Sequence, residues 1–104
     1  MIIAEFVYVD KTINNFNVRG HANFDNYGKD IVCSAVTGIV SGALNAFDSL
    51  YNDCFKIDVK TNKISVNILK NTKEVSILLN FLLIQLETIS TQYPENFIIK
   101  KVGE

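Results

Sequence analysis

Several residue types that often indicate a function are scarce in this sequence. Its 104 residues contain one histidine, two cysteines, one proline and no tryptophan. A zinc site normally takes four Cys or His ligands, or three ligands and a water molecule, and this sequence cannot supply them at a convincing spacing. We therefore expect an activity that needs neither a metal nor another cofactor.

The sequence also lacks a charge imbalance, a membrane span and a targeting segment. Ten basic and eleven acidic residues give a net charge of -1, so we expect no direct binding to nucleic acid or to a membrane surface. The longest apolar stretch, Val75 to Leu86, is shorter than the roughly 20 residues that cross a bilayer. Residues 1–5 lack the basic region and cleavage site of a signal peptide. These absences predict a cytoplasmic protein.

What is present is apolar material for one domain over residues 1–104, with no repeat or linker. Alternating residues predict a hairpin, in which Phe16 and Val18 face the core while Asn17 and Arg19 face outward. The predicted elements in order are strands over 3–9 and 13–20, a helix over about 30–51, strands over 55–60 and 63–68, a helix from 75 to the Tyr93-Pro94 break, and a strand over 97–100. This order, ββαββαβ, predicts an α+β two-layer sandwich with two helices on one face of a mainly antiparallel sheet.

The two predicted helices carry more small and apolar residues than one core requires. In the second helix Ile77, Phe81 and Ile84 form an extra apolar stripe, which predicts a homodimer. In the first helix Gly38 and Gly42 allow a neighbouring backbone to come close, and we expect them to pack tightly against the second helix.

Cys33 is the candidate nucleophile. If the first helix begins at Asp30, the Asp30 side chain can cap it by accepting from the amide of Cys33. Free amides and the helix dipole at this end favour a thiolate and could also stabilise an oxyanion. The alternative is that Cys33 is a small buried apolar residue.

His21 is the candidate proton-transfer partner. It follows a predicted strand and is joined to Cys33 by a polar loop, and catalysis by a Cys-His pair requires the imidazole within hydrogen-bond distance of the sulfur. A single histidine next to a glycine can equally be an exposed loop residue. Cys54 lies beyond the end of the same helix, roughly 30 Å from Cys33, so no disulfide is expected and Cys54 is read as a core or loop thiol.

The segment around these two residues resembles a known family. Gly20-His21-Ala22, then Gly28, then Asp30-Ile31-Val32-Cys33-Ser34-Ala35-Val36 is similar to the signature of the ribosomal-processing cysteine protease Prp family. That signature has Gly-His-Ala followed about a dozen residues later by Asp-Ile-Val-Cys and a helix rich in small residues. Length and element order agree as well, so the resemblance covers essentially the whole chain.

The resemblance implies a cysteine endopeptidase with His21 and Cys33 as its catalytic dyad. It implies a substrate, the N-terminal extension of the large-subunit ribosomal protein numbered twenty-seven, cut after an aromatic-containing segment and before small residues. It also implies that the loop between the dyad residues closes around the peptide, where Phe24 and Tyr27 could receive aromatic side chains. The supporting residues on this interpretation are Gly20, Ala22, Phe24, Tyr27, Gly28, Asp30, Ser34 and Thr37.

Two departures from the family pattern and three open questions remain at this point. Ser34 stands where the family often has alanine, and Thr37 stands where serine is common, which could alter a hydrogen bond near the site. Asp30 could be a helix cap or a third catalytic member that orients His21. The chain could also be a noncatalytic ribosome-associated module, or another small thiol hydrolase or acyltransferase that shares the dyad.

Overall fold

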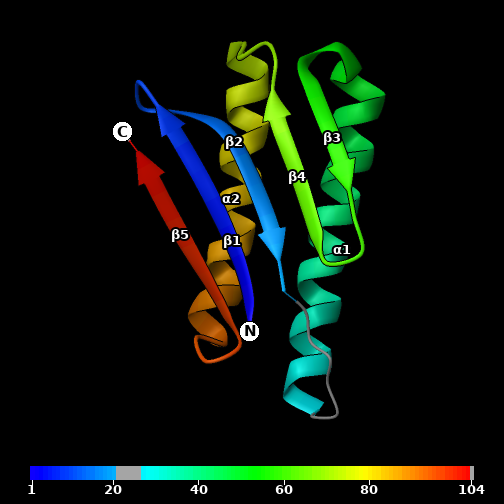
Figure 1. Ribbon diagram of the computed structural model, residues 1–104, viewed down its shortest axis with the longest axis vertical. Helices are drawn as coiled ribbons and strands as arrows, with labels where there is room; N and C mark the ends of the chain where they lie inside the picture. Colours follow the sequence, from blue (N-terminus) through cyan, green and yellow to red (C-terminus); the bar gives the residue numbers. More distant parts are fainter. Residues whose placement is uncertain (21–26, 104) are drawn as a thin grey trace.

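The computed structural model describes residues 1–20 and 27–103, and for residues 27–30 it describes the backbone only. One five-stranded sheet is covered on one face by two helices (Figure 1). The elements are β1 (Ile2–Val9), β2 (Thr12–Arg19), α1 (Tyr27–Tyr51), β3 (Phe55–Val59), β4 (Lys63–Ile68), α2 (Lys73–Gln92) and β5 (Phe97–Gly103), with a short 3₁₀ turn at Asn52–Cys54. The predicted order ββαββαβ is confirmed.

The sheet is mixed but mostly antiparallel. Its strand order is β3-β4-β2-β1-β5, and the pairs β1–β2, β2–β4 and β3–β4 are antiparallel. The remaining pair is parallel, with Ile2 of β1 opposite Phe97 of β5. The predicted α+β two-layer fold is therefore confirmed, and β1 lies inside the sheet between two strands that are far apart in the sequence.

The core lies between the sheet and the helices. Phe16 is 1% exposed and Val18 8% exposed, which confirms their predicted inward direction. Between α1 and β3 the rings of Phe47 and Phe55 stack with centroids 4.2 Å apart. Each helix contributes one apolar stripe, made of Val32, Val36, Val40 and Phe47 in α1 and of Val75, Leu79, Leu82 and Leu86 in α2. Burying an aliphatic or aromatic side chain of this size stabilises the fold by about 1.5–3 kcal/mol.

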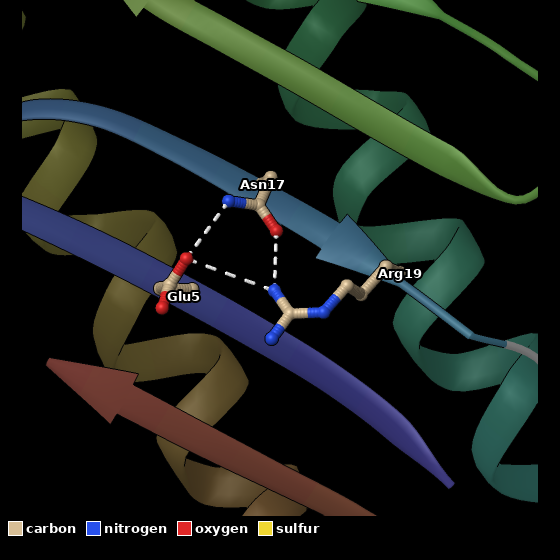
Figure 2. Close-up of polar contacts among 3 residues, drawn as sticks. All are labelled: Glu5, Asn17 and Arg19. Atoms are coloured by element: carbon tan, nitrogen blue, oxygen red, sulfur yellow. Dashed lines mark hydrogen bonds and ion pairs between the residues drawn. The ribbon is translucent and has the colours of Figure 1, made fainter.

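The opposite face of the sheet is polar at β1 and β2. Figure 2 shows Glu5, Asn17 and Arg19 joined in a triangle. Arg19 Nη1 donates to Asn17 Oδ1 at 2.8 Å, Asn17 Nδ2 donates to Glu5 Oε1 at 3.3 Å, and Arg19 and Glu5 form an ion pair at 3.7 Å. These side chains face away from the helices, as the alternation predicted for Asn17 and Arg19. They tie the last residue of β2 to the neighbouring strand.

The start of α1 differs from its prediction. The helix begins at Tyr27, so Asp30 is its fourth residue and does not precede the helix as an N-cap residue would. The prediction that Asp30 caps the helix was therefore wrong. By contrast, α2 has an ordinary cap, since the Thr72 side chain accepts a 3.1 Å hydrogen bond from the amide of Val75.

The glycines of α1 also lie elsewhere than predicted. A β-carbon placed on Gly38 or on Gly42 would meet no atom within 4 Å beyond the local helix backbone. Neither glycine packs tightly against α2, so that prediction was wrong. Both residues lie on the outer side of α1, away from Val36 and Val40, which are buried against the sheet.

Candidate active site

Cys33 lies beside a cavity of about 270 Å³ between α1 and the turn that joins β3 to β4. Cys33, Val36, Thr37 and Val40 of α1 form one wall, and residues 59–64 form the opposite wall. Ile2 and Val18 also line it, and Gly20 completes the lining at the end of β2. Its lining is mixed, with aliphatic side chains from both walls, the Cys33 thiol and the Thr37 hydroxyl on the α1 side, and polar residues, two of them lysines, on the turn side.

The Cys33 side chain is partly buried and packs against the core. Its Sγ lies 4.0 Å from Oγ1 of Thr37, which is one helical turn further along α1. Residues four apart on a helix share a face, so this contact follows directly from the sequence spacing. Ser34, the next residue after Cys33, is exposed and does not line the cavity.

The early start of α1 changes the expected role of the Cys33 amide. The amides without a helical partner are those of the first four residues, which are 27–30 here, and Cys33 is the seventh residue. Its own N–H is therefore in position to donate to a backbone carbonyl inside the helix. The Cys33 amide is thus not among the free amides at this helix end, and the dipole of the helix acts on Cys33 from one turn further away.

Gly20 is the residue through which β2 reaches the cavity. Its φ is +78°, a left-handed conformation, and a β-carbon there would lie 2.3 Å from the carbonyl oxygen of Met1. Its amide donates a 3.3 Å hydrogen bond to the carbonyl of Asn62 in the β3–β4 turn. Only glycine fits this position without strain, because any side chain would collide with the backbone of Met1.

The cavity brings together some of the predicted site residues and not others. Cys33, Thr37 and Gly20 line it. The predictions for His21, Ala22 and Phe24 lie outside the described residues, as does the predicted closure of their segment around a peptide. For Tyr27, Gly28 and Asp30 the structure gives a helical backbone.

Sequence reasoning missed the β3–β4 turn as part of this site. Residues 59–64 were predicted as the edges of a hairpin, with no role in the cavity. The hairpin is closed by a hydrogen bond of 2.8 Å from the amide of Lys60 to the carbonyl of Lys63. The sequence indicates a short turn at this point, but it carries no signal that the turn lies opposite the start of α1.

Cys54 behaves as the predicted core thiol. It is 4% exposed, and its Sγ lies 3.6 Å from Asp53 Oδ1. Burial, followed by the negative charge of Asp53, raises the pKa of the Cys54 thiol above its ordinary value. Asp53 is itself paired with Lys70 at 3.0 Å, and this pairing lowers the pKa of the Asp53 carboxyl. Cys54 therefore keeps its proton at neutral pH and is a poor nucleophile.

No three side chains of the Cys, His, Asp or Glu type come together as a metal site within residues 1–20 and 31–103. The chemistry that these residues offer is that of a thiol beside a cavity large enough for one substrate side chain.

Comparison with known proteins identifies the class of enzyme. Residues 1–98 match the family model described as cysteine protease Prp. The ribosomal processing cysteine protease Prp of Mycoplasma genitalium is 34% identical over 92 residues, which cover 84% of this chain and 88% of that protein. The protein of the same name from Staphylococcus aureus strain Mu50 is 30% identical over 99 residues, covering 86% and 93%. The chain is a cysteine protease.

Solved structures agree with the sequence matches. The essential ribosomal processing protease Prp of S. aureus in complex with a covalently linked product peptide superposes with a TM-score of 0.87 at 26% identity, covering 97% of this chain and 99% of that one. The same protease with a substrate peptide gives a TM-score of 0.88 at 25% identity, with the same coverage. This chain belongs to the ribosomal processing cysteine protease Prp family, as its resemblance predicted.

Proposed function

We propose that this protease uses Cys33 as nucleophile and His21 as proton-transfer partner to remove the N-terminal extension of a large-subunit ribosomal protein, the one numbered twenty-seven. The observation that carries the proposal is the cavity, which is lined by both Cys33 and Gly20. His21 follows Gly20 directly in the chain. This adjacency in the chain supports the pairing of the only histidine of the sequence with the Cys33 thiol.

The proposed reaction has two stages. The Cys33 sulfur attacks the carbonyl carbon of the scissile peptide bond, a C–S bond forms, and the C–N bond breaks as His21 protonates the departing amine. A water molecule then gives a proton to His21 and attacks the thioester carbonyl. The C–S bond breaks, and the new carboxylate leaves with the thiol restored. No cofactor enters either stage.

The size of the cavity suits an apolar side chain of the substrate, next to the scissile bond. Its volume is about 270 Å³, and an aliphatic cavity of about 150 Å³ is large enough for benzene. Val36, Val40 and Ile64 give it aliphatic walls beside Cys33. We propose that it receives an aromatic side chain of the substrate, and that Phe24 and Tyr27 add further apolar contacts.

Of the two roles considered for Asp30, helix cap and third member of the site, we favour the second. Because α1 begins at Tyr27, capping no longer accounts for an aspartate at this position. We propose that Asp30 orients His21 as a positioning residue. Asp30→Asn should then lower kcat and shift the acidic limb of the pH profile, whereas an unchanged profile would leave Asp30 as a favourable negative charge in the first helical turn.

The experiment incubates the purified protein with a synthetic peptide that spans the extension and the first residues of the mature ribosomal protein. Mass spectrometry should find one cleavage, after an aromatic-containing segment. Alanine in place of the aromatic residues of the peptide should slow the cleavage. Cys33→Ala and His21→Ala should each reduce the rate at least about a thousandfold.

Cys54→Ser is the matched control, because it removes the other thiol from a buried position remote from the cavity. It should keep cleavage at temperatures where it is folded, as monitored by circular dichroism. Full activity in Cys33→Ala or His21→Ala would refute the dyad. A wild-type protein that hydrolyses a simple thioester but does not cleave the peptide would instead favour a different thiol hydrolase.

We propose further that the enzyme acts in the cytoplasm, where ribosomes are assembled, and that it works as a homodimer. The support for the dimer is the exposed apolar stripe on α2, since Ile77, Phe81 and Ile84 are 58%, 64% and 61% exposed.

A further inference from the structure

Three basic residues gather at the end of the sheet that borders the active-site cavity. Lys60 and Lys63 lie at the β3–β4 turn and line the cavity, and Arg19 is the last residue of β2. Figure 1 shows the end of β2 and this turn at the same end of the sheet, beside the first half of α1. We call Arg19, Lys60 and Lys63 the basic cluster.

Two members of the basic cluster lie directly opposite one another, Arg19 on β2 and Lys63 on β4. Both are on the face of the sheet away from the helices, because the next pair along, Val18 and Ile64, packs on the core side. Like charges in this arrangement destabilise a sheet. Among the paired strand residues that the structure describes, no other pair has two charges of the same sign. The sequence thus accepts a repulsion beside the cavity that a neutral residue at position 63 would avoid.

Nearby carboxylates neutralise the basic cluster only in part. Glu5 pairs with Arg19 at 3.7 Å and draws its guanidinium toward β1 (Figure 2). Asp58 pairs with Lys60 at 3.7 Å, but the two side chains are 58% and 73% exposed, and such a pair is weak. Lys63 forms no ion pair within the part of the chain whose side chains the structure describes. Its ammonium group is therefore available to an anion from outside the protein.

The anion that suits this position is a carboxylate of the substrate peptide. The cluster adjoins the cavity whose opposite wall bears Cys33, so a peptide at the nucleophile passes close to it. Residues of an extended peptide are about 3.3 Å apart, so one that is three positions away from the cavity lies within about 10 Å of it. Nucleic acid is disfavoured, because Glu5 and Asp58 within the cluster would repel its phosphates.

We infer that the basic cluster, chiefly through Lys63, selects substrates that carry an aspartate or glutamate within three residues of the side chain that fills the cavity. This inference rests on the proposed use of the cavity for a substrate side chain. The enzyme then recognises two features of one peptide, an apolar side chain in the cavity and a carboxylate at the end of the sheet. Lys63 is a specificity residue and takes no part in bond formation at Cys33.

Sets of matched peptides test the inference. Each set is the synthetic peptide described above with one residue, up to three positions from its aromatic segment, replaced by aspartate, asparagine or lysine. Asparagine has the shape of aspartate without its charge. At one position or more, the wild-type kcat/KM for the aspartate peptide should be at least about threefold that for the asparagine peptide, as expected for an exposed ion pair. The lysine peptide should be cleaved more slowly than either. Raising NaCl from about 50 to about 500 mM should bring the aspartate-to-asparagine ratio toward one.

Lys63→Glu should reverse this preference, so that the lysine peptide is cleaved faster than the aspartate peptide. The same substitution places a carboxylate opposite Arg19 and removes the repulsion, so it should also raise the midpoint of urea denaturation. Lys56→Glu is the matched control. Lys56 is exposed on the same face of the same hairpin, but it is opposite Asn67 and does not line the cavity. This variant should keep the wild-type preference.

Equal cleavage of the aspartate and asparagine peptides at every position would overturn the inference and leave the proposed function intact. A wild type that cleaves none of the peptides would overturn both. The inference also fails if the preference for aspartate survives in Lys63→Glu, or if Lys56→Glu loses it to the same extent. A lower urea midpoint in Lys63→Glu would contradict the repulsion between Arg19 and Lys63. Binding of a single-stranded RNA oligonucleotide that Lys63→Glu abolishes, with no preference among the peptides, would assign the cluster to nucleic acid instead.

Discussion

Gly20→Ala tests how the end of β2 is built. The alanine must adopt a φ of +78°, which costs an L-residue about 1–2 kcal/mol. Its β-carbon would also lie 2.3 Å from the Met1 carbonyl oxygen, so the chain has to shift. That shift weakens the hydrogen bond from Gly20 to Asn62, or the one from Ile2 to Asn96, for about 1 kcal/mol more.

The expected loss is therefore about 2–3 kcal/mol of unfolding free energy, or roughly 10–20 °C in Tm for a domain of this size. Urea denaturation followed by circular dichroism measures it. The parent for this comparison is Phe81→Glu, so that self-association does not contribute to the stability.

Gly38→Ala in the same parent is the matched control. It adds the same methyl group to a glycine that has helical φ and open space around it, so the substitution should raise stability by about 0.5–1 kcal/mol. The two alanines should thus act with opposite signs. A Gly20→Ala protein whose stability lies within about 0.5 kcal/mol of its parent would refute the account of β2 given above.

Two further predictions concern the thiols. Iodoacetamide at neutral pH should alkylate Cys33 well before Cys54, because burial raises the pKa of the Cys54 thiol and hides it until the protein unfolds; equal rates in the folded protein would contradict this. Thr37→Val should slow alkylation of Cys33 about two- to fivefold, because it removes the hydroxyl that lies 4.0 Å from the sulfur. Thr37→Ser keeps a hydroxyl and should keep the wild-type rate. An identical rate of alkylation in both variants would show that the contact has no effect on the thiol.

The parts of the fold that depend on local periodicity could be predicted from the sequence. Phe16 and Val18 alternate with Asn17 and Arg19, and a strand with one wet face has no other arrangement. The pairing of β5 with β1 could not be predicted, because it joins segments at opposite ends of the sequence and has no local signal. The same limit applies to the β3–β4 turn as a wall of the site.

The errors at α1 have identifiable causes. Capping rules favour Asp30 as a start, and the mainly polar residues before it, with Gly28 among them, are typical of a loop and not of the helical turn that begins at Tyr27. Gly38 and Gly42 were predicted to pack against α2 because small residues let a neighbouring backbone come close. Helical geometry argues otherwise, since Gly38 lies two residues from both Val36 and Val40 and is thus about 200° around the helix from each.

The position of β1 has a consequence for how the enzyme is made. Its Ile2 pairs with Phe97, which the ribosome adds roughly ninety-five residues later. Until then one edge of β1, a central strand of the sheet, has no partner strand. Long-range pairing of this kind is slow to form. A nascent chain that already carries Gly20, Cys33 and everything between them still lacks its finished sheet, so proteolytic competence should arise only after synthesis of the domain is almost complete.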